Sequence, residues 1–591
     1  MKTKLIFLPA LCITLLSGCG ETKEVADMIV VANQIYTANE KGEFADAIAI
    51  KDGKYIYVGN IEGAKKYAGD ITSYYSTEFI MPSGVEAHAH FLLEQAFMDS
   101  CYITRKVNGV YRSKADVLGD IEKYAEENGF TGAEGEHLFG YGYGQIQLFN
   151  PFEGGRGYCR QDLDNICGGA LANIPIYIAE ESLHEAWVNT CTLERAGIAM
   201  QLKEGEKDPI VGILRDEDGY PTGVLTNEAV TYLLQKGFRY PICSDIGYKK
   251  VVKNTSEYLN SMGYTMHYDA WTNFDGTDLI YKALHDIDKA NELTCVYTGS
   301  YNIATFEYRT SKLDDILNKI VDIRNNYKSD RFDPKYIKLF ADGVLETGTG
   351  FLKEPYSAVY TGTGEQIWQQ DDMNKIVLEA NKKDLLVHTH TLGDASAAES
   401  IQSFVYSNNQ LGKKTRNSLG HCCLVDDEDI AYLKDNEIGS AVNAGWLTET
   451  GDGFDLHATI VGQERAKDLY PYDKMLRAGA KPAISTDRPC TEGPIDIFDY
   501  MASIVLGYPS DLTNQVARRE LNVSVKDAID MLTINGAWMA NYEGTRGSIE
   551  VGKFADFVTA KHSPFYCNPR LIKDINIEAT CFEGKFVYFN K

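Results

Sequence analysis

Between about residues 82 and 542, this 591-residue chain alternates short apolar, strand-like runs with helical stretches. Such alternation predicts a parallel β-sheet, either open or closed into a barrel. Clear strand-like runs are 336–340, 385–388 and 481–484, and each is followed by polar or glycine-rich sequence that carries His, Asp or Lys. Catalytic groups of an α/β barrel lie where strands pass into loops at the carboxyl-terminal face. We therefore expect an α/β fold with its reactive residues gathered at one end.

The two ends of the chain have a different texture. Short β-like runs separated by turn residues occupy the first part after residue 24, and similar runs return after residue 546. This pattern predicts one small β-sandwich domain built from residues 19–81 and 546–591, on either side of a barrel domain at 82–545. Alternation is weaker and turn signals are frequent from about 101 to 239, so we expect an insertion there, after the first barrel strand.

Composition excludes several classes of protein. Hydrophobic residues make up 44% of the chain and charged residues 24%, which is typical of a folded chain with a substantial core. The formal net charge is −26. Because such a surface repels phosphate backbones, nucleic acid is excluded as the expected partner.

The first segment resembles a targeting signal. Lys2 and Lys4 precede an apolar run at 5–16, which is too short to span a bilayer core of about 30 Å. The residues Leu16-Ser17-Gly18-Cys19 resemble the lipobox of bacterial lipoproteins. This resemblance implies a signal peptide at 1–18, a lipid anchor on Cys19 and a place in the cell envelope. Gly20 follows Cys19, and the absence of aspartate at this position resembles lipoproteins sorted to the outer membrane, facing the periplasm. The alternative is a plain cleaved signal with an accidental cysteine.

Candidate metal ligands stand at several strand ends. His88 and His90 lie two positions apart, so on a strand they share one face about 6.6 Å apart and could bind one metal ion. A single pair of this kind is weak evidence. Further strand ends carry imidazole or carboxylate, the ligands that zinc prefers: His390, His421 and Asp487.

Lys338 places an amine within a strand-like run, where a buried charge would be costly. Its alternative role is that of an edge-strand lysine that reaches water.

The order of these residues is recognisable. Together they resemble the ligand set of the metal-dependent amidohydrolase superfamily: His88-x-His90, Lys338, His390, His421 and Asp487, in that order. Flanking segments resemble one branch of it, amidohydrolase family 3, which includes the N-substituted formamide deformylases; these segments are 184–189, 219–225, 338–343, 390–394, 469–471 and 547–556. The resemblance implies a (β/α)8 TIM-like barrel.

The resemblance also implies a role for each residue. His88 and His90 would hold the more buried of two zinc ions together with Asp487. His390 and His421 would hold the second, and Lys338, carboxylated by carbon dioxide, would bridge the two.

Asp487 would be the proton shuttle for a metal-activated hydroxide that attacks an amide carbon. His184 would orient the substrate carbonyl, although a packing role beside Trp187 is the alternative.

Some positions depart from the family pattern. Gly420 stands where family members often carry a glutamate before the strand-six histidine, so any role of that carboxylate is absent. His388 lies two positions before His390 and is expected either to support the site, to face substrate, or only to pack.

The expected function is hydrolysis of amide-type C–N bonds, other than peptide bonds, in a small molecule. One alternative is a single-metal deaminase of the same superfamily, which Lys338 and Gly420 disfavour. Another is a lipoprotein that binds ligands without catalysis, which the complete ligand set disfavours. The sequence leaves the substrate and the oligomeric state open.

Overall fold

The computed structural model describes residues 24–97, 100–103, 106–107, 110–143, 158–180, 183–235, 245–443, 446, 452–490, 496–507 and 521–590. The expected signal peptide and Cys19 lie outside the described residues. Within the described part, no helix has both the length and the apolar character needed to cross a membrane.

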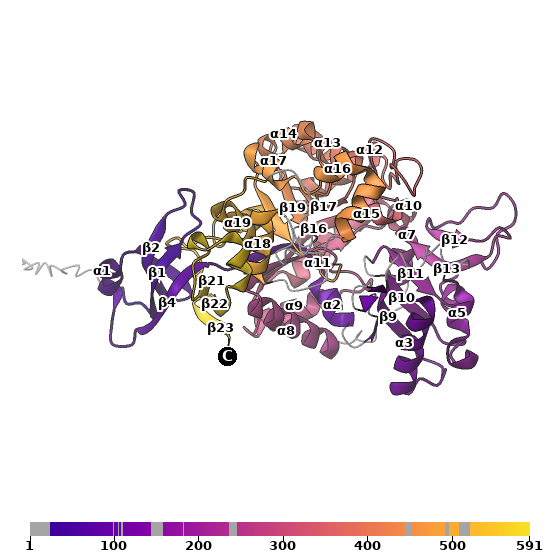
Figure 1. Cartoon of the computed structure of the whole chain (residues 1–591), viewed down its shortest axis with the longest axis horizontal. Helices are drawn as coiled ribbons and strands as arrows, with labels where there is room; N and C mark the ends of the chain where they lie inside the picture. Colours follow the sequence, from indigo (N-terminus) through magenta and orange to yellow (C-terminus); the bar gives the residue numbers. More distant parts are fainter. Residues whose placement is uncertain are drawn as a thin grey trace, which may run out of the picture.

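Eight strands form the central sheet, and all neighbouring pairs are parallel. In chain order they are β5 (Gly84–Ala89), β14 (Tyr264–Asp269), β15 (Val296–Asn302), β16 (Phe332–Phe340), β17 (Leu386–Thr391), β18 (Ser418–His421), β19 (Gly439–Asn443) and β20 (Pro482–Ser485). The first and last strands meet just beyond their ends, where the backbone N–H of Asp487 donates to His88 O at 3.0 Å and that of His90 to Arg488 O at 2.6 Å. The predicted α/β barrel is confirmed (Figure 1).

Burial explains why these segments form a barrel. Strands of a parallel sheet are covered on both faces and therefore consist of nearly continuous buried residues, as in β5 and β14. The intervening helices bury one apolar face; in α9 that face includes Ile280, Ala283, Leu284 and Ile287. The helices that follow successive strands include α9 (Leu279–Lys289), α11 (Leu313–Tyr327), α12 (Gln370–Lys382), α13 (Asp394–Leu411) and α14 (Asp427–Asp435).

The two chain ends form one sheet of seven strands. Its order is β23 (Lys585–Phe589), β22 (Ile577–Phe582), β21 (Phe557–Ala560), β4 (Ser73–Pro82), β1 (Met28–Tyr36), β2 (Phe44–Lys51) and β3 (Lys54–Gly59). β4 joins the two parts, because it pairs with β1 on one side and with β21 on the other. The hydrogen bonds connect all seven strands into a single continuous sheet, so the two chain ends share one β unit, as the sequence predicts.

The segment between α2 (Phe91–Phe97) and α8 (Asp245–Ser261) carries a sheet of its own. Its strands are β12 (Ile213–Arg215), β13 (Pro221–Thr226), β11 (Glu185–Val188), β10 (Ile176–Glu180), β9 (Leu138–Tyr143) and β6 (Cys101–Tyr102), in that order across the sheet. It lies after the first barrel strand. In Figure 1 this inserted sheet and the terminal sheet lie at opposite ends of the molecule, with the barrel between them.

Candidate metal centre

The carboxylate of Asp487 lies among histidines from different strands. His88 and His90, at the end of β5, are both buried, and their ring centroids are 5.5 Å apart with the rings nearly perpendicular. Asp487 Oδ1 is 3.4 Å from His88 Nε2 and 3.5 Å from His90 Nε2. Closure of the barrel causes this meeting, because Asp487 follows β20 and bonds directly to the β5 backbone.

His390 on β17 and His421 on β18 complete the ring of imidazoles. Their centroids are 4.4 Å apart, and that of His421 is 4.5 Å from His88. His421 Nδ1 lies 3.7 Å from Asp487 Oδ2. The structure therefore brings the four expected histidine ligands and the expected carboxylate to one place.

Lys338 joins the same cluster from β16. Its side chain is fully buried, and Nζ lies 3.3 Å from His88 Nε2. Burial lowers the pKa of the amine to about 7. Among the described residues, no carboxylate forms an ion pair with this amine.

Two of the expected ligand histidines have polar partners that the sequence analysis missed. His390 Nδ1 donates to Asp342 Oδ1 at 2.9 Å, and the other oxygen of Asp342 accepts from the backbone of Gly393 at 2.8 Å. His421 Nδ1 lies 3.0 Å from the amide nitrogen of Asn443. A carboxylate that accepts from one ring nitrogen, as Asp342 does from His390, fixes the orientation of a ligating imidazole. Asp342 follows a barrel strand and Asn443 ends one, and these positions are the sequence signal that could have identified them.

His388 supports His88 in a similar way. His88 Nδ1 is 2.6 Å from His388 Nε2, and His388 Nδ1 is 2.7 Å from Ser418 Oγ. The space for the His388 ring exists because residue 420 is glycine. A Cβ at Gly420 would lie 2.7 Å from His388 Nε2 and 2.8 Å from His88 Nδ1.

Several observations show that this cluster fits a divalent metal. His90 Nδ1, His421 Nε2 and Asp487 Oδ1 are buried polar atoms that have no hydrogen-bond partner among the described residues. Burial, together with neighbouring cationic groups, lowers the pKa of His88, His390 and His421 well below the usual value, so their rings are neutral and offer lone pairs. Ligand atoms of His88, His421 and Asp487 lie within 4.8 Å of one another.

Backbone conformation also marks the site. His421 has a φ of 66° and Asp487 a φ of 56°, in the left-handed region that non-glycine residues rarely adopt. Strain of this kind gathers at functional sites, where the surrounding structure holds it.

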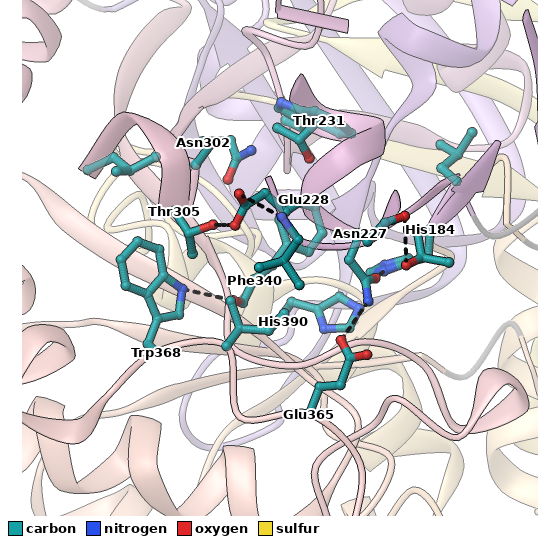
Figure 2. Close-up of a pocket in the computed structure, with 18 of the residues that line it drawn as sticks. His184, Asn227, Glu228, Thr231, Asn302, Thr305, Phe340, Glu365, Trp368 and His390 are labelled. Atoms are coloured by element: carbon teal, nitrogen blue, oxygen red, sulfur yellow. Dashed lines mark hydrogen bonds between the residues drawn. The ribbon is translucent and has the colours of Figure 1, made fainter. Parts of the chain in front are cut away.

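A cavity of about 380 Å³ extends from the cluster toward the inserted sheet. His90, His390, His421 and Asp487 border it at the barrel end. Aromatic and aliphatic side chains form much of its wall, among them Trp271, Phe340 and Trp368. Figure 2 shows the cavity with His184 and His390 on its lining.

His184 reaches this cavity from the start of β11, and its ring centroid is 4.7 Å from that of His390. Its Nδ1 lies 2.8 Å from Asn227 Oδ1, while Asn227 Nδ2 donates to Glu365 Oε2 at 3.1 Å (Figure 2). A carboxylate only accepts hydrogen bonds, so the Asn227 oxygen must face His184 and accept from its Nδ1–H. Burial lowers the pKa of His184 to about 3, so the ring is neutral and its lone pair is on Nε2.

Residues 78–588 match the model of an amidohydrolase family. The chain belongs to the amidohydrolase family. Over 566 residues it is 23% identical to the putative amidohydrolase YtcJ of Bacillus subtilis strain 168. The aligned region covers 94% of this chain and 98% of that protein. It is also 21% identical over 577 residues to the N-substituted formamide deformylase of Arthrobacter pascens, covering 96% of this chain and 99% of the relative.

Solved structures agree with this membership. The amidohydrolase chain described here matches the crystal structure of an uncharacterized metal-dependent hydrolase from Pyrococcus horikoshii OT3 with a TM-score of 0.67 and 20% identity, over 92% of this chain and 99% of the other. At this identity the likeness shows a shared fold. Family and site together identify the protein as a metal-dependent hydrolase of the amidohydrolase superfamily.

Proposed function

We propose that this protein hydrolyses C–N bonds, other than peptide bonds, in small amide-type substrates such as N-formyl and N-acyl amines. The observation that carries the proposal is the position of Asp487, whose carboxylate lies within 3.7 Å of three histidines and borders the cavity. The name of the Arthrobacter relative supports the same bond type.

We assign the ligands of two zinc ions as the family resemblance implies. His88, His90 and Asp487 would hold one ion, and His390 with His421 the other. A bound divalent metal supplies Lewis-acid chemistry, because it polarises a carbonyl and lowers the pKa of water.

Lys338 would bridge the two ions after carboxylation. In that reaction the neutral amine forms an N–C bond to carbon dioxide and releases one proton, so a buried amine becomes an anionic ligand. The contact of Nζ with His88 and the lack of a described ion-pair partner support this assignment.

The protein's own side chains would handle protons and orientation. Asp487 would accept a proton from the attacking water and return it to the leaving nitrogen. His184, which borders the cavity and lies beside His390, would orient the substrate as the family resemblance implies.

An activity screen with the Asp487→Asn variant tests this proposal. Purified protein is incubated with N-formyl, N-acyl and cyclic amides, the released amine is measured, and bound metal is determined by mass spectrometry. We expect about two zinc ions per chain, and a kcat about 10²–10⁴-fold lower in the variant.

The matched control is Asp426→Asn, an exposed carboxylate paired with Lys353 on the barrel surface. We expect its kcat to equal that of the parent. Turnover retained by Asp487→Asn in folded protein contradicts the proton role, and one metal per chain with release of ammonia indicates the deaminase instead.

We also propose that a lipid on Cys19 anchors the protein in the cell envelope. The residues 16–19 support this proposal. Cell fractionation tests it: Cys19→Ala should move the protein from the membrane fraction to the soluble one, and membrane retention of that variant contradicts the anchor.

A further inference from the structure

A buried amide that has no hydrogen-bond partner among the described residues borders the cavity. Asn302 ends β15, its side chain is 1% exposed, and it borders the cavity. Neither Oδ1 nor Nδ2 has a hydrogen-bond partner among the described residues. Figure 2 shows the Asn302 amide among the side chains that line the cavity. Buried amides are almost always paired, so these two atoms point to a ligand.

The position of Asn302 is fixed by its neighbours. Its backbone N–H donates to Asn273 Oδ1 at 2.7 Å, and its carbonyl accepts from Asn273 Nδ2 at 3.3 Å. In the sheet, Asn302 is the register partner of Lys338 on β16. The amide is therefore held at the rim of the barrel, one strand away from the metal cluster.

A second unpaired donor borders the same cavity. Trp271 follows β14 and is 3% exposed, and its Nε1 has no hydrogen-bond partner among the described residues. Its ring contacts Phe340, with centroids 5.7 Å apart. Strands β14 and β15 are neighbours, and both Trp271, which follows β14, and Asn302, which ends β15, border the cavity.

The chemistry of these groups defines the ligand. A carboxamide offers one donor and one acceptor in a plane, and an N–H beside a C=O satisfies both at once. Primary amides, lactams and ureas have this arrangement. The indole N–H adds one more donor for the ligand carbonyl.

Charge argues against an anionic ligand. Among the described lining residues, Arg309 is the sole lysine or arginine, and both of its terminal nitrogens bond to the Glu228 carboxylate. A ligand carboxylate beside Asn302 would therefore find no available lysine or arginine among the described lining residues, and Glu365 also borders the cavity.

We propose that Asn302 and Trp271 form a subsite for an uncharged amide, lactam or urea group, with the apolar body of the ligand against Phe340 and Trp368. That this ligand is the substrate rests on the proposed function; the binding preference itself does not.

Titration calorimetry tests the preference with three probes that share a phenyl ring: benzamide, acetophenone and benzoate. We expect benzamide to bind at least about tenfold more tightly than the other two, because acetophenone lacks the N–H and benzoate also carries a charge. The order should persist after metal removal by a chelator. This binding measurement needs no turnover, so its outcome tests the subsite independently of the hydrolase assignment.

Substitutions test which residues cause the preference for benzamide. Asn302→Leu and Asn302→Ser should each abolish the benzamide preference, and Trp271→Phe should reduce it severalfold while keeping the ring. Gln366→Leu is the matched control, since Gln366 lines the same cavity but already donates to Glu399.

Two results overturn the proposal. One is an unchanged benzamide preference in folded Asn302→Leu or Asn302→Ser. The other is that these variants lose bound metal but keep the benzamide preference. That result would mean that Asn302 positions Lys338 and does not bind the ligand. An intact preference in a protein that hydrolyses no amide would refute the proposed function and leave the subsite standing.

Discussion

The imidazole of His88 is constrained on both of its nitrogens. Nδ1 meets His388 at 2.6 Å, and Nε2 faces both Lys338 at 3.3 Å and Asp487 at 3.4 Å. Because the partner on Nδ1 sets the proton position, it also sets whether Nε2 can offer its lone pair. A substitution that moves the His388 ring should therefore change the affinity of the site for metal.

Gly420→Ala tests this dependence. The new Cβ would lie within 2.8 Å of both His88 and His388, so both rings must shift. We expect metal affinity, measured by chelator competition, to fall about 10–100-fold while the circular dichroism spectrum stays unchanged.

The control for this substitution is Gly119→Ala in α3 (Lys114–Glu127), where a Cβ meets nothing within 4 Å. Alanine in a helix should leave metal affinity unchanged and raise stability slightly. Unaltered affinity in Gly420→Ala would show that His388 does not position His88.

The sequence predicts the ligand positions better than the groups that hold them. His88, His90, Lys338, His390, His421 and Asp487 stand at strand ends in a recognisable order. The importance of Asn302 depends on its register with Lys338, and that of Gly420 on the distance between two rings. Neither relation exists in the sequence until strands from distant segments are paired.

At the scale of elements, the barrel closes where the ends of its first and last strands, β5 and β20, meet. A buried side chain strengthens it, because Glu86 Oε1 accepts from the backbone of His88 at 3.0 Å and of Thr486 at 3.1 Å. Burial raises the pKa of Glu86 to about 8 despite these bonds.

This shift makes the stability of the metal-stripped protein depend on pH. An acid whose pKa rises on folding favours the folded state fully below its unfolded value of about 4.3, and this contribution is lost as pH rises toward 8. Glu86→Gln removes the titration. The unfolding free energy of the variant minus that of the parent, from urea titrations, should therefore increase between pH 4.5 and pH 8.

An exposed carboxylate serves as the control for the same pH series: Glu62→Gln should show a constant difference from the parent. A constant difference for Glu86→Gln as well would mean that Glu86 is not protonated in the folded protein.

Elements differ in how well the sequence predicts them. Barrel strands as short as β18 and β20, four residues each, are found because they lead into ligand residues. The sequence predicts that the two chain ends share one β unit, but it does not predict the pairing of β4 with β21, which joins residues more than 450 positions apart. Alternating patterns define strands but not their long-range partners.

The whole molecule consists of a barrel with one sheet at each end (Figure 1). The turn between β22 and β23 connects the terminal sheet to the barrel through Glu583. Its carboxylate accepts from Arg331 Nη2 at 2.6 Å and from Arg546, while Arg331 also bonds Asp288 on α9 at 2.9 Å. Arg546 is itself buried. Glu583 therefore pairs with two largely buried guanidinium groups, each of which also has a second carboxylate partner: Asp288 for Arg331 and Asp556 for Arg546.

Removing that carboxylate should weaken the joint strongly. Glu583→Ala removes this partner from both guanidinium groups, which keep Asp288 and Asp556, and the loss of such hydrogen bonds to a charged group costs about 1.5–3 kcal/mol of unfolding free energy. Burial raises the pKa of Glu583, but Arg331 and Arg546 outweigh it, so the pKa lies below its usual value. The stabilisation is therefore complete above about pH 4.3 and is lost as pH falls through the lowered pKa.

Urea unfolding of parent and Glu583→Ala at a series of pH values measures this effect, with the exposed Glu62→Ala as a control expected to change stability by less than about 1 kcal/mol. We expect a large difference at pH 7 that shrinks below about pH 4.3. A difference that stays constant to pH 3 would mean that lost packing, and not the charge of Glu583, accounts for the effect.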